Sequence, residues 1–492
     1  MLIFRNSGYS HHGASRSKSS LISWNSTSYS AHEDISENLS LLRERSRDLY
    51  SGGGPIGRGA IDRVVLNSIG SGLRLNVRIN GSKVGMTPEE SSEWASNIES
   101  VFDAWASRKR ASIDGTLNFY ELQVLAFKSV LLDGDCFIVF GLNDGHNRRD
   151  NLFTRLQVGL IEGERVADPT VKPSGVIIDE GVELDEMGRP VAYYIANRNP
   201  ESTLINQPIL EFKRVPIYDE VTGERNILHL FNPERIGQRR GVPFLAPVIE
   251  TLKQLSRYTD AELMAAVVSG MYSVFFEHPE RESGQVGEES YASEEGLGGL
   301  EGLENITQQE MYGTVIDLPE GVKVSTASPG RPNQNFNAFI ASLVQQIGGA
   351  LGIPSELLFL HFTASYSASR GALLEAWKLF RYWREWFASN FCQPVYEKFL
   401  YDYLLAVQDE QFTKSDYRDE DYFYWAAWTG PSQGQLDPVK EVNAAIQRVN
   451  NGFSTYQKET GELTGEDFEM NIAQLKREKE LLRGIQDKKA GS

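Results

Sequence analysis

The stretch from Gln238 to Met271 reads QRRGVPFLAPVIETLKQLSRYTDAELMAAVVSGM and decides the fold. Its apolar residues recur at the spacing of one face of an α-helix. Pro243 and Pro247 stand near its start, where a missing backbone N–H costs little, and Gly270 is placed to end it. We therefore predict a helix over Phe244–Met271, about 40 Å long by the usual helical rise. The apolar positions of this face are Leu245, Val248, Ile249, Leu252, Leu255, Leu263 and Val267.

A second apolar helix is predicted at Asn333–Leu351, where the helical spacing is the clearest in the chain. Between the two helices, Glu277–Glu304 contains nine glutamates against one arginine, with repeated glycines. Such a segment cannot bury enough apolar surface to pack by itself. Short strands are expected on either side of it, at Tyr272–Glu277 and within Met311–Ser325. The chain thus predicts two long helices that flank a small exposed insert.

The composition is that of a globular protein with more than one packed unit. The chain has 492 residues, of which 40% are hydrophobic and 24% are charged. The formal net charge of −18 argues against a general nucleic-acid binder, which has to neutralise phosphates. No apolar run is long enough for a membrane span, so we expect no membrane partner. The two cysteines, Cys136 and Cys392, have no metal-ligand spacing, and we interpret them as buried thiols.

Residues 33–243 are predicted to form an α+β body, after a Ser-rich segment over 1–32 that we expect to be a mobile tail. The glycines Gly52, Gly54 and Gly57 match a dinucleotide-binding fingerprint in spacing. They follow a helical pattern rather than a strand, and we interpret them as a flexible turn. Helices are expected over 33–50, from Ala60, from Pro88 behind a capping box, and over 118–132. The strands expected are Asp135–Leu142, Phe153–Glu162, Val176–Leu184, Val191–Ala196 and Ile227–Phe231.

The last third of the chain is predicted to be mostly helical. Leu358–Arg370 reads LFLHFTASYSASR, rich in small and hydroxyl-bearing residues, and is interpreted as a loop between two helices. Gly371–Leu405 is predicted as a long aromatic helix that is kinked or broken near Pro394. Residues 431–492 are expected to form a small helical unit, with one helix opened by Pro438 and another started near Thr464.

The sequence contains few residue patterns that point to catalysis. The sequence contains no nucleophile elbow, no HExxH zinc motif and no phosphate-binding loop of the Walker type. One alternative is a serine hydrolase that uses Ser365 or Ser367 with His361, although the pattern supplies no residue to orient the base. We therefore expect no catalytic residue, no cofactor and no metal, and we favour a structural or scaffold role.

Seven blocks, collinear between about residues 60 and 485, carry a family resemblance through their order and spacing. They are AIDRVVLNSIGSGLRL from Ala60, LLDGDCF from Leu131, GVELDEMGRPVAYYI from Gly181, ILHLFNPERIGQRRGVPFLAPVI from Ile227, LGIPSELL from Leu351, SYSASRGALLE from Ser365 and LDPVKE from Leu436. Together they resemble the portal proteins of tailed bacteriophages, lambda-type family.

The resemblance implies a ring, usually of twelve copies, at one vertex of a capsid, assembled in the host cytoplasm. Such a ring is the channel for double-stranded DNA in packaging and ejection. It docks the terminase large subunit, head-completion adaptor and tail proteins, and it contacts the major capsid protein. The implied fold has an α/β wing (33–243 and 371–430), a two-helix stem (244–271 and 332–351), a small α/β clip (272–331), a tunnel-loop region (352–370) and a helical crown (431–492).

The same resemblance points to three groups of site residues. In the stem, Lys253 and Arg257 share a helix face, which we expect to face the channel, a neighbouring stem helix or solvent. The tunnel-loop residues expected near DNA are His361, Phe362, Ser365, Tyr366, Ser367 and Arg370. The clip residues expected to meet terminase and adaptors are Glu280, Glu282, Glu288, Glu289, Glu294 and Glu295.

The net charge agrees with a channel that must let DNA slide. Twelve copies carry about −200 formal charges, which repels DNA from most of the surface. Each strong phosphate contact holds the strand in place, so we expect an acidic or mixed channel with a few cations. Besides the hydrolase, a further alternative is a different structural phage component, a monomeric minor head protein, and the mass of the assembled particle distinguishes it from a portal ring.

Overall fold

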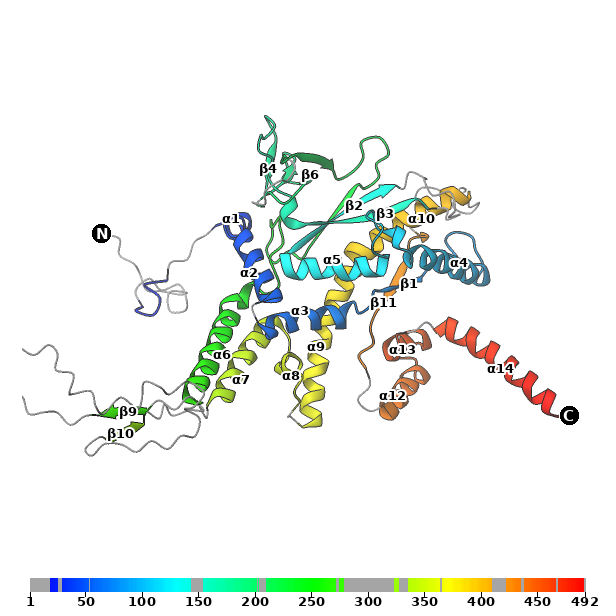
Figure 1. The fold of residues 1–492 in the computed structure, drawn as a ribbon. Helices are drawn as coiled ribbons and strands as arrows, with labels where there is room; N and C mark the ends of the chain where they lie inside the picture. Colours follow the sequence, from blue (N-terminus) through cyan, green and yellow to red (C-terminus); the bar gives the residue numbers. More distant parts are fainter. Residues whose placement is uncertain are drawn as a thin grey trace, which may run out of the picture. The chain divides into compact units, whose positions relative to one another are not determined.

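The computed structural model describes residues 18–24, 29–52, 54–142, 154–200, 202, 209–270, 274–277, 323–326, 335–362, 365–408, 422–434, 438–465 and 468–490. The chain divides into two compact units, one made of Met1–Lys253 with Val344–Ser492 and the other of Gln254–Leu343. Helices and strands are mixed along the chain, so the predicted α+β class is confirmed (Figure 1). The clip glutamates and much of the Ser-rich tail lie outside the described residues.

The two larger antiparallel sheets form most of the β part of the first unit. In one, β2 (Asp135–Leu142) lies between β3 (Leu156–Glu162) and β8 (Ile227–Phe231). In the other, the strand order is β4 (Ile177–Asp179), β5 (Val182–Leu184), β6 (Pro190–Ala196) and β7 (Phe212–Pro216). The two sheets share one apolar core, made of Phe137, Ile161, Val166, Val182, Leu184, Tyr193, Ile195 and Ile227.

The first helices differ from the prediction in two respects. The single helix expected over 33–50 is two, α1 (Ala31–Ser36), which a capping box at Ser30 opens, and α2 (Leu39–Ser51). The flexible turn expected over Gly52, Gly54 and Gly57 is wrong at its last glycine, because Gly57 lies inside α3 (Pro55–Ser68), whereas Gly52 and Gly54 lie between α2 and α3. Pro55 starts α3 at the position that suits proline. A Cβ atom at Gly57 would lie 3.4 Å from the Leu252 side chain, an ordinary van der Waals distance, so α3 lies close to that side chain here.

An aromatic core joins distant parts of the first unit. The capping box at Thr87 opens α4 (Pro88–Ala106), as predicted, and α5 (Phe119–Asp133) ends at Gly134. The ring of Phe102 on α4 packs edge-on against Phe119 and Phe399, with centroids 5.7 and 5.0 Å away. Phe399 belongs to α10 (Gln393–Val407), so this contact ties the C-terminal half of the chain to α4 and α5.

The long aromatic helix is broken where the sequence predicts it. It consists of α9 (Tyr366–Phe387), a π-helical turn over Ala388–Cys392, and α10. Pro394 has no backbone N–H to donate, and a proline at this position disturbs the regular helical ladder. The chain then returns as β11 (Ala426–Thr429), which pairs antiparallel with β1 (Arg74–Val77), a strand pair that the sequence analysis did not predict.

The predicted long helix begins later than expected. A short 3-10 turn over Ala246–Val248 precedes α6 (Ile249–Gly270), and the Phe244 N–H donates to the Leu131 carbonyl oxygen instead of to a helical partner. The second predicted helix is α7 (Phe336–Leu351). Within the second unit, Tyr258 of α6 packs against two α7 rings, Phe336 at 5.6 Å and Phe339 at 4.9 Å between centroids.

Short strands and four further α-helices complete the strands and α-helices that the structure describes. β9 (Val274–Glu277) pairs antiparallel with β10 (Lys323–Thr326). The C-terminal part contains α12 (Pro438–Asn450), α13 (Tyr456–Leu463) and α14 (Phe468–Ala490), of which α13 was not predicted. Between α7 and α9 lies the short α8 (Ser355–Phe359). None of the helices that the structure describes is both long and apolar enough to span a bilayer.

Candidate functional site

A buried charge cluster lies where the chain enters the segment that leads to α6. Its centre is Asp135, the first residue of β2, whose side chain is fully buried. Asp135 Oδ1 accepts from Arg43 NH2 at 2.8 Å, and Oδ2 accepts from Arg240 Nε at 2.6 Å. His229 Nε2 lies 3.3 Å from Oδ2. One carboxylate therefore holds together α2, β2, β8 and the 238–243 connector.

The connector is fixed by backbone contacts as well as by charge. Arg240 donates to the carbonyl oxygens of Gly163 at 2.5 Å, Val166 at 2.9 Å and Glu180 at 2.6 Å. A Cβ atom at Gly241 would lie 1.9 Å from the Gly134 carbonyl oxygen, so only glycine allows these two backbone segments to come this close. The blocks LLDGDCF and QRRGVPF, which are about a hundred residues apart in sequence, thus meet at the start of α6.

The electrostatics of the cluster favour an ionised Asp135 and a neutral His229. Burial alone would raise the pKa of Asp135, but the guanidinium groups of Arg240 and Arg43 outweigh it and hold this pKa well below its usual range. Burial lowers the pKa of His229, and the attraction of Asp135 only partly offsets this. The imidazole also stacks on Phe137, with ring centroids 4.0 Å apart. We interpret the cluster as a structural joint that carries the start of α6.

Because His229 of this cluster is buried and neutral, we expect the folded protein to lose stability in mild acid. Below the ordinary histidine pKa of about 6.5, the unfolded chain takes up a proton at His229 that the folded chain excludes. Stability is therefore complete above that pH and falls below it, by about 1 kcal/mol per pH unit for one proton. Thermal unfolding of the parent chain and of His229→Gln, followed from pH 7.5 to 5, measures this. Equal pH slopes for both proteins would contradict the assignment.

The two predicted stem cations are both exposed on α6. Lys253 Nζ lies 3.6 Å from the carboxylate of Asp48, and both side chains are more than half exposed. An ion pair this exposed contributes little to stability. Arg257 lies one helical turn further along α6. An apolar stripe follows on the same helix, where Leu263 is 64% and Val267 is 49% exposed.

The loop predicted over 358–370 is shorter than expected. Its start belongs to α8, and its end from Tyr366 onward belongs to α9. Ser365 caps α9, because its hydroxyl accepts from the Ala368 N–H at 3.4 Å. The run of small residues that suggested a loop is therefore a helix start. Of the residues predicted near DNA, His361 and Phe362 lie before the cap and are exposed, and Tyr366, Ser367 and Arg370 lie in the first turns of α9.

Among the described residues, Ser365 and His361 make no contact that would form the serine hydrolase site considered as an alternative. The Ser365 hydroxyl is engaged in the helix cap. Arg370 points to a structural partner as well, since its guanidinium lies 3.8 Å from the Glu441 carboxylate of α12. In the part of the chain that the structure describes, no group of three or more His, Cys, Asp or Glu residues is placed to hold a metal ion.

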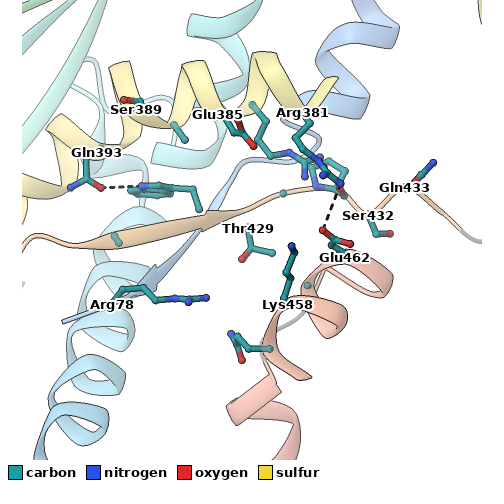
Figure 2. Close-up of a pocket in the computed structure, with 18 of the residues that line it drawn as sticks. Arg78, Arg381, Glu385, Ser389, Gln393, Thr429, Ser432, Gln433, Lys458 and Glu462 are labelled. Atoms are coloured by element: carbon teal, nitrogen blue, oxygen red, sulfur yellow. Dashed lines mark hydrogen bonds and ion pairs between the residues drawn. The ribbon is translucent and has the colours of Figure 1, made fainter. Parts of the chain in front are cut away.

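A pocket of about 800 Å³ lies between α9, β11 and α13 (Figure 2). Figure 2 shows Arg381 of α9 and Glu462 of α13 pointing toward each other, with the charged groups 3.6 Å apart. Lys458 reaches in from α13 and Arg78 from the end of β1. The sequence does not predict this pocket, because its walls come from segments up to about 380 residues apart.

One arginine in the pocket wall connects α9 to the segment that leads into α12. Arg384 donates to the carbonyl oxygens of Ser68 at 2.9 Å, Asn67 at 3.0 Å and Pro431 at 2.7 Å. Burial lowers its pKa to about 10, so it still carries its charge at neutral pH. Gly430 leaves room for this side chain, since a Cβ atom there would lie 2.7 Å from Arg384 Nε. We interpret the pocket as a joint between the body and the C-terminal helices.

A match to a protein family identifies the group of proteins to which this chain belongs. Residues 17–384 match the family described as phage portal protein, lambda family. The chain belongs to this family. The match includes both blocks that meet at Asp135, and it ends inside α9, before the pocket wall is complete.

Individual relatives agree with the family match over nearly the whole chain. The portal protein of Escherichia phage N15 is 23% identical over 96% of this chain and 89% of its own length. Portal protein B of Escherichia phage lambda is 24% identical with the same coverage. Among solved structures, a chain in the neck of an empty gene transfer agent particle is 13% identical, with a TM-score of 0.49 over 85% of this chain and 92% of its own.

Proposed function

We propose that this chain is the portal, or head–tail connector, of a tailed phage, and that it works as a ring of identical copies at one capsid vertex. Membership of the phage portal family is the observation that carries the proposal. The ring, with about twelve copies, surrounds a channel for DNA in packaging and ejection. On this account the chain is a structural protein of the virion, and it performs no bond chemistry.

The exposed apolar stripe on α6 supports assembly with other copies. Leu263, Met264 and Val267 are each about half or more exposed within the chain. Neighbouring large apolar side chains on one helix face are typical of a surface that another chain covers. A ring places the same helix of the next copy beside it, and every copy then covers one neighbour and is covered by the other.

The parts of the chain divide the work in this proposal. The wing is 33–243 with 371–430, and the cluster at Asp135 carries the stem, 244–271 with 332–351. The stem lines part of the channel, and the clip over 272–331 docks the terminase large subunit and later the head-completion adaptor. The tunnel-loop region is 352–370, where His361 and Phe362 are the exposed residues nearest DNA. The crown is 431–492.

Lys253 and Arg257 are expected to act on DNA in the channel. Replacing both with alanine removes two cations per copy from the channel wall and therefore weakens transient contacts with phosphates. We expect faster slipping of DNA back out of the ring in a packaging assay, with normal assembly. Lys378→Ala is the matched control, because Lys378 is also exposed and paired with an exposed acid, Glu375. Slipping equal to that of the control would remove these two residues from the channel.

The acidic insert is expected to bind terminase. Deletion of 280–304 should abolish capture of the terminase large subunit. The number of copies in the assembled particle should stay the same. A second variant keeps the length and changes the glutamates at 280, 282, 288, 289, 294 and 295 to glutamine, which separates charge from bulk. Normal terminase capture by the deletion would show that the clip lies elsewhere.

A further inference from the structure

The first C-terminal helix has an apolar stripe that the chain itself leaves uncovered. On α12, the side chains of Val439, Val442 and Ile446 are exposed by 71%, 40% and 48%. The face that contacts the rest of the chain is a different one: Ala445 is buried, and Arg448 donates two bonds to the Glu459 carboxylate of α13, at 2.9 and 2.5 Å. At 100° per residue, the middle of the stripe lies roughly a third of a turn from the middle of this inward face.

The last helix carries a second stripe of the same kind. The first turns of α14 pack on α13, where the Phe468 ring stacks on Tyr456 at 5.3 Å and the Phe468 N–H donates to Gln457 Oε1 at 3.2 Å. The same apolar face continues through Ile472 to Leu475 and Leu482. Figure 1 shows α14 running on past the end of α13, and there Leu475 and Leu482 are 48% and 58% exposed.

We propose that the stripe of α14 in one copy packs on the stripe of α12 in the next copy around the ring. The two stripes have the same length, because Val439 and Ile446, like Leu475 and Leu482, are seven positions apart, or about 10 Å along the helix. Apolar residues three, four and seven positions apart are also the spacing at which two helices interlock.

A second copy is the occupant that this geometry favours. Both stripes belong to the same small helical unit, so each copy offers a complementary pair of different surfaces. A contact between two different surfaces of identical chains repeats head to tail, and it closes when the rotation allows a ring. One kind of contact then covers both stripes in every copy and leaves none exposed. The inference rests on the proposed ring and adds a contact that joins neighbouring C-terminal units.

Disulfide trapping in the full-length assembled protein tests the contact. The test variant is Val442→Cys with Leu475→Cys. The control is Gln447→Cys with Leu475→Cys, because Gln447 is exposed on α12 but lies about 100° or more around the helix from Ile446 and Val442. The native cysteines, Cys136 and Cys392, are buried and do not compete. After mild oxidation we expect a ladder of covalent multimers in the test variant, several-fold above the control, with the peptide map joining α12 to α14.

The other outcomes overturn the contact in distinguishable ways. A covalent dimer with Val442→Cys alone would mean that α12 meets α12. A disulfide within one chain would mean that α14 folds back on its own α12. No ladder in particles of normal mass would leave the ring intact and assign the stripes to a different partner. If no multi-copy particle forms even with the parent chain, the proposed function fails together with the inference.

A charge variant gives a second measurement that does not depend on oxidation. Leu475→Asp with Leu482→Asp places two charges on the stripe, whereas Arg477→Asp adds a negative charge on the opposite face of α14. Helix content and particle mass should stay normal in both. We expect the stripe variant to dissociate at clearly lower denaturant concentration than the Arg477→Asp control. Equal dissociation midpoints would contradict the contact.

Discussion

Asp135→Asn is expected to destabilise the first unit by about 3–5 kcal/mol, the usual cost of removing one partner from a buried ion pair. The substitution keeps the shape of the side chain but removes its charge. Arg43 and Arg240, only 4% and 2% exposed, are then left without the carboxylate that compensates them. Because Arg240 belongs to the 238–243 connector, the segment that leads into α6 should loosen first.

Thermal unfolding and limited proteolysis measure this effect. Glu375→Gln is the control, because Glu375 pairs with Lys378 where both side chains are more than two-thirds exposed, and its loss should change stability little. Cleavage of Asp135→Asn is expected first near the 238–243 connector. Arg240→Gln should cost less stability when it is added to Asp135→Asn than in the parent chain, because the two side chains interact directly. An unfolding temperature for Asp135→Asn equal to that of the control would show that the cluster is not the joint.

Leu263→Glu with Val267→Glu is expected to abolish assembly. On the proposed account these side chains are covered by the next copy, so the change places two unpaired charges in every contact of the ring. Each contact then loses several kcal/mol, and the same loss is repeated around the whole ring. We expect particles of the parent mass to fall to a small fraction of the protein, with the remainder as single folded chains.

Light scattering after size-exclusion chromatography measures that change in mass. The control is Gln254→Glu with Ala261→Glu, which places two charges seven residues apart on a different, exposed face of α6. Circular dichroism should show the same helix content in both variants. Parent-size particles from the Leu263→Glu, Val267→Glu variant would contradict burial of this stripe between copies.

Elements set by local periodicity were predictable from the sequence. The two long helices, the break at Pro394 and the strands β2 and β8 follow from spacing and from proline and glycine positions alone. The strand β11 was missed, because four residues among aromatic neighbours give no periodic signal, and its partner β1 lies about 350 residues away. The turn expected over Gly52–Gly57 is wrong at Gly57, because Pro55 starts α3 there and the spacing of the glycines does not reveal that start.

The sequence motifs that form the buried charge cluster were predictable, but the contacts between them were not. The sequence shows LLDGDCF and QRRGVPF as separate motifs, and only the fold brings Asp135 and Arg240 together. The pocket beside Arg384 has the same origin, since its walls join three distant segments. Which cations face a channel depends on how copies surround it, and no property of a single chain determines that for Lys253 or Arg257.

The proposed function depends most on closure of identical copies around a central hole. The most direct test is the mass of the purified full-length protein under assembly conditions, measured by mass photometry and combined with negative-stain images. We expect rings with an open centre, near 660 kDa for about twelve copies of the 55.1 kDa chain. A single folded chain of about 55 kDa at every concentration and salt condition, with no ring in the images, would contradict it.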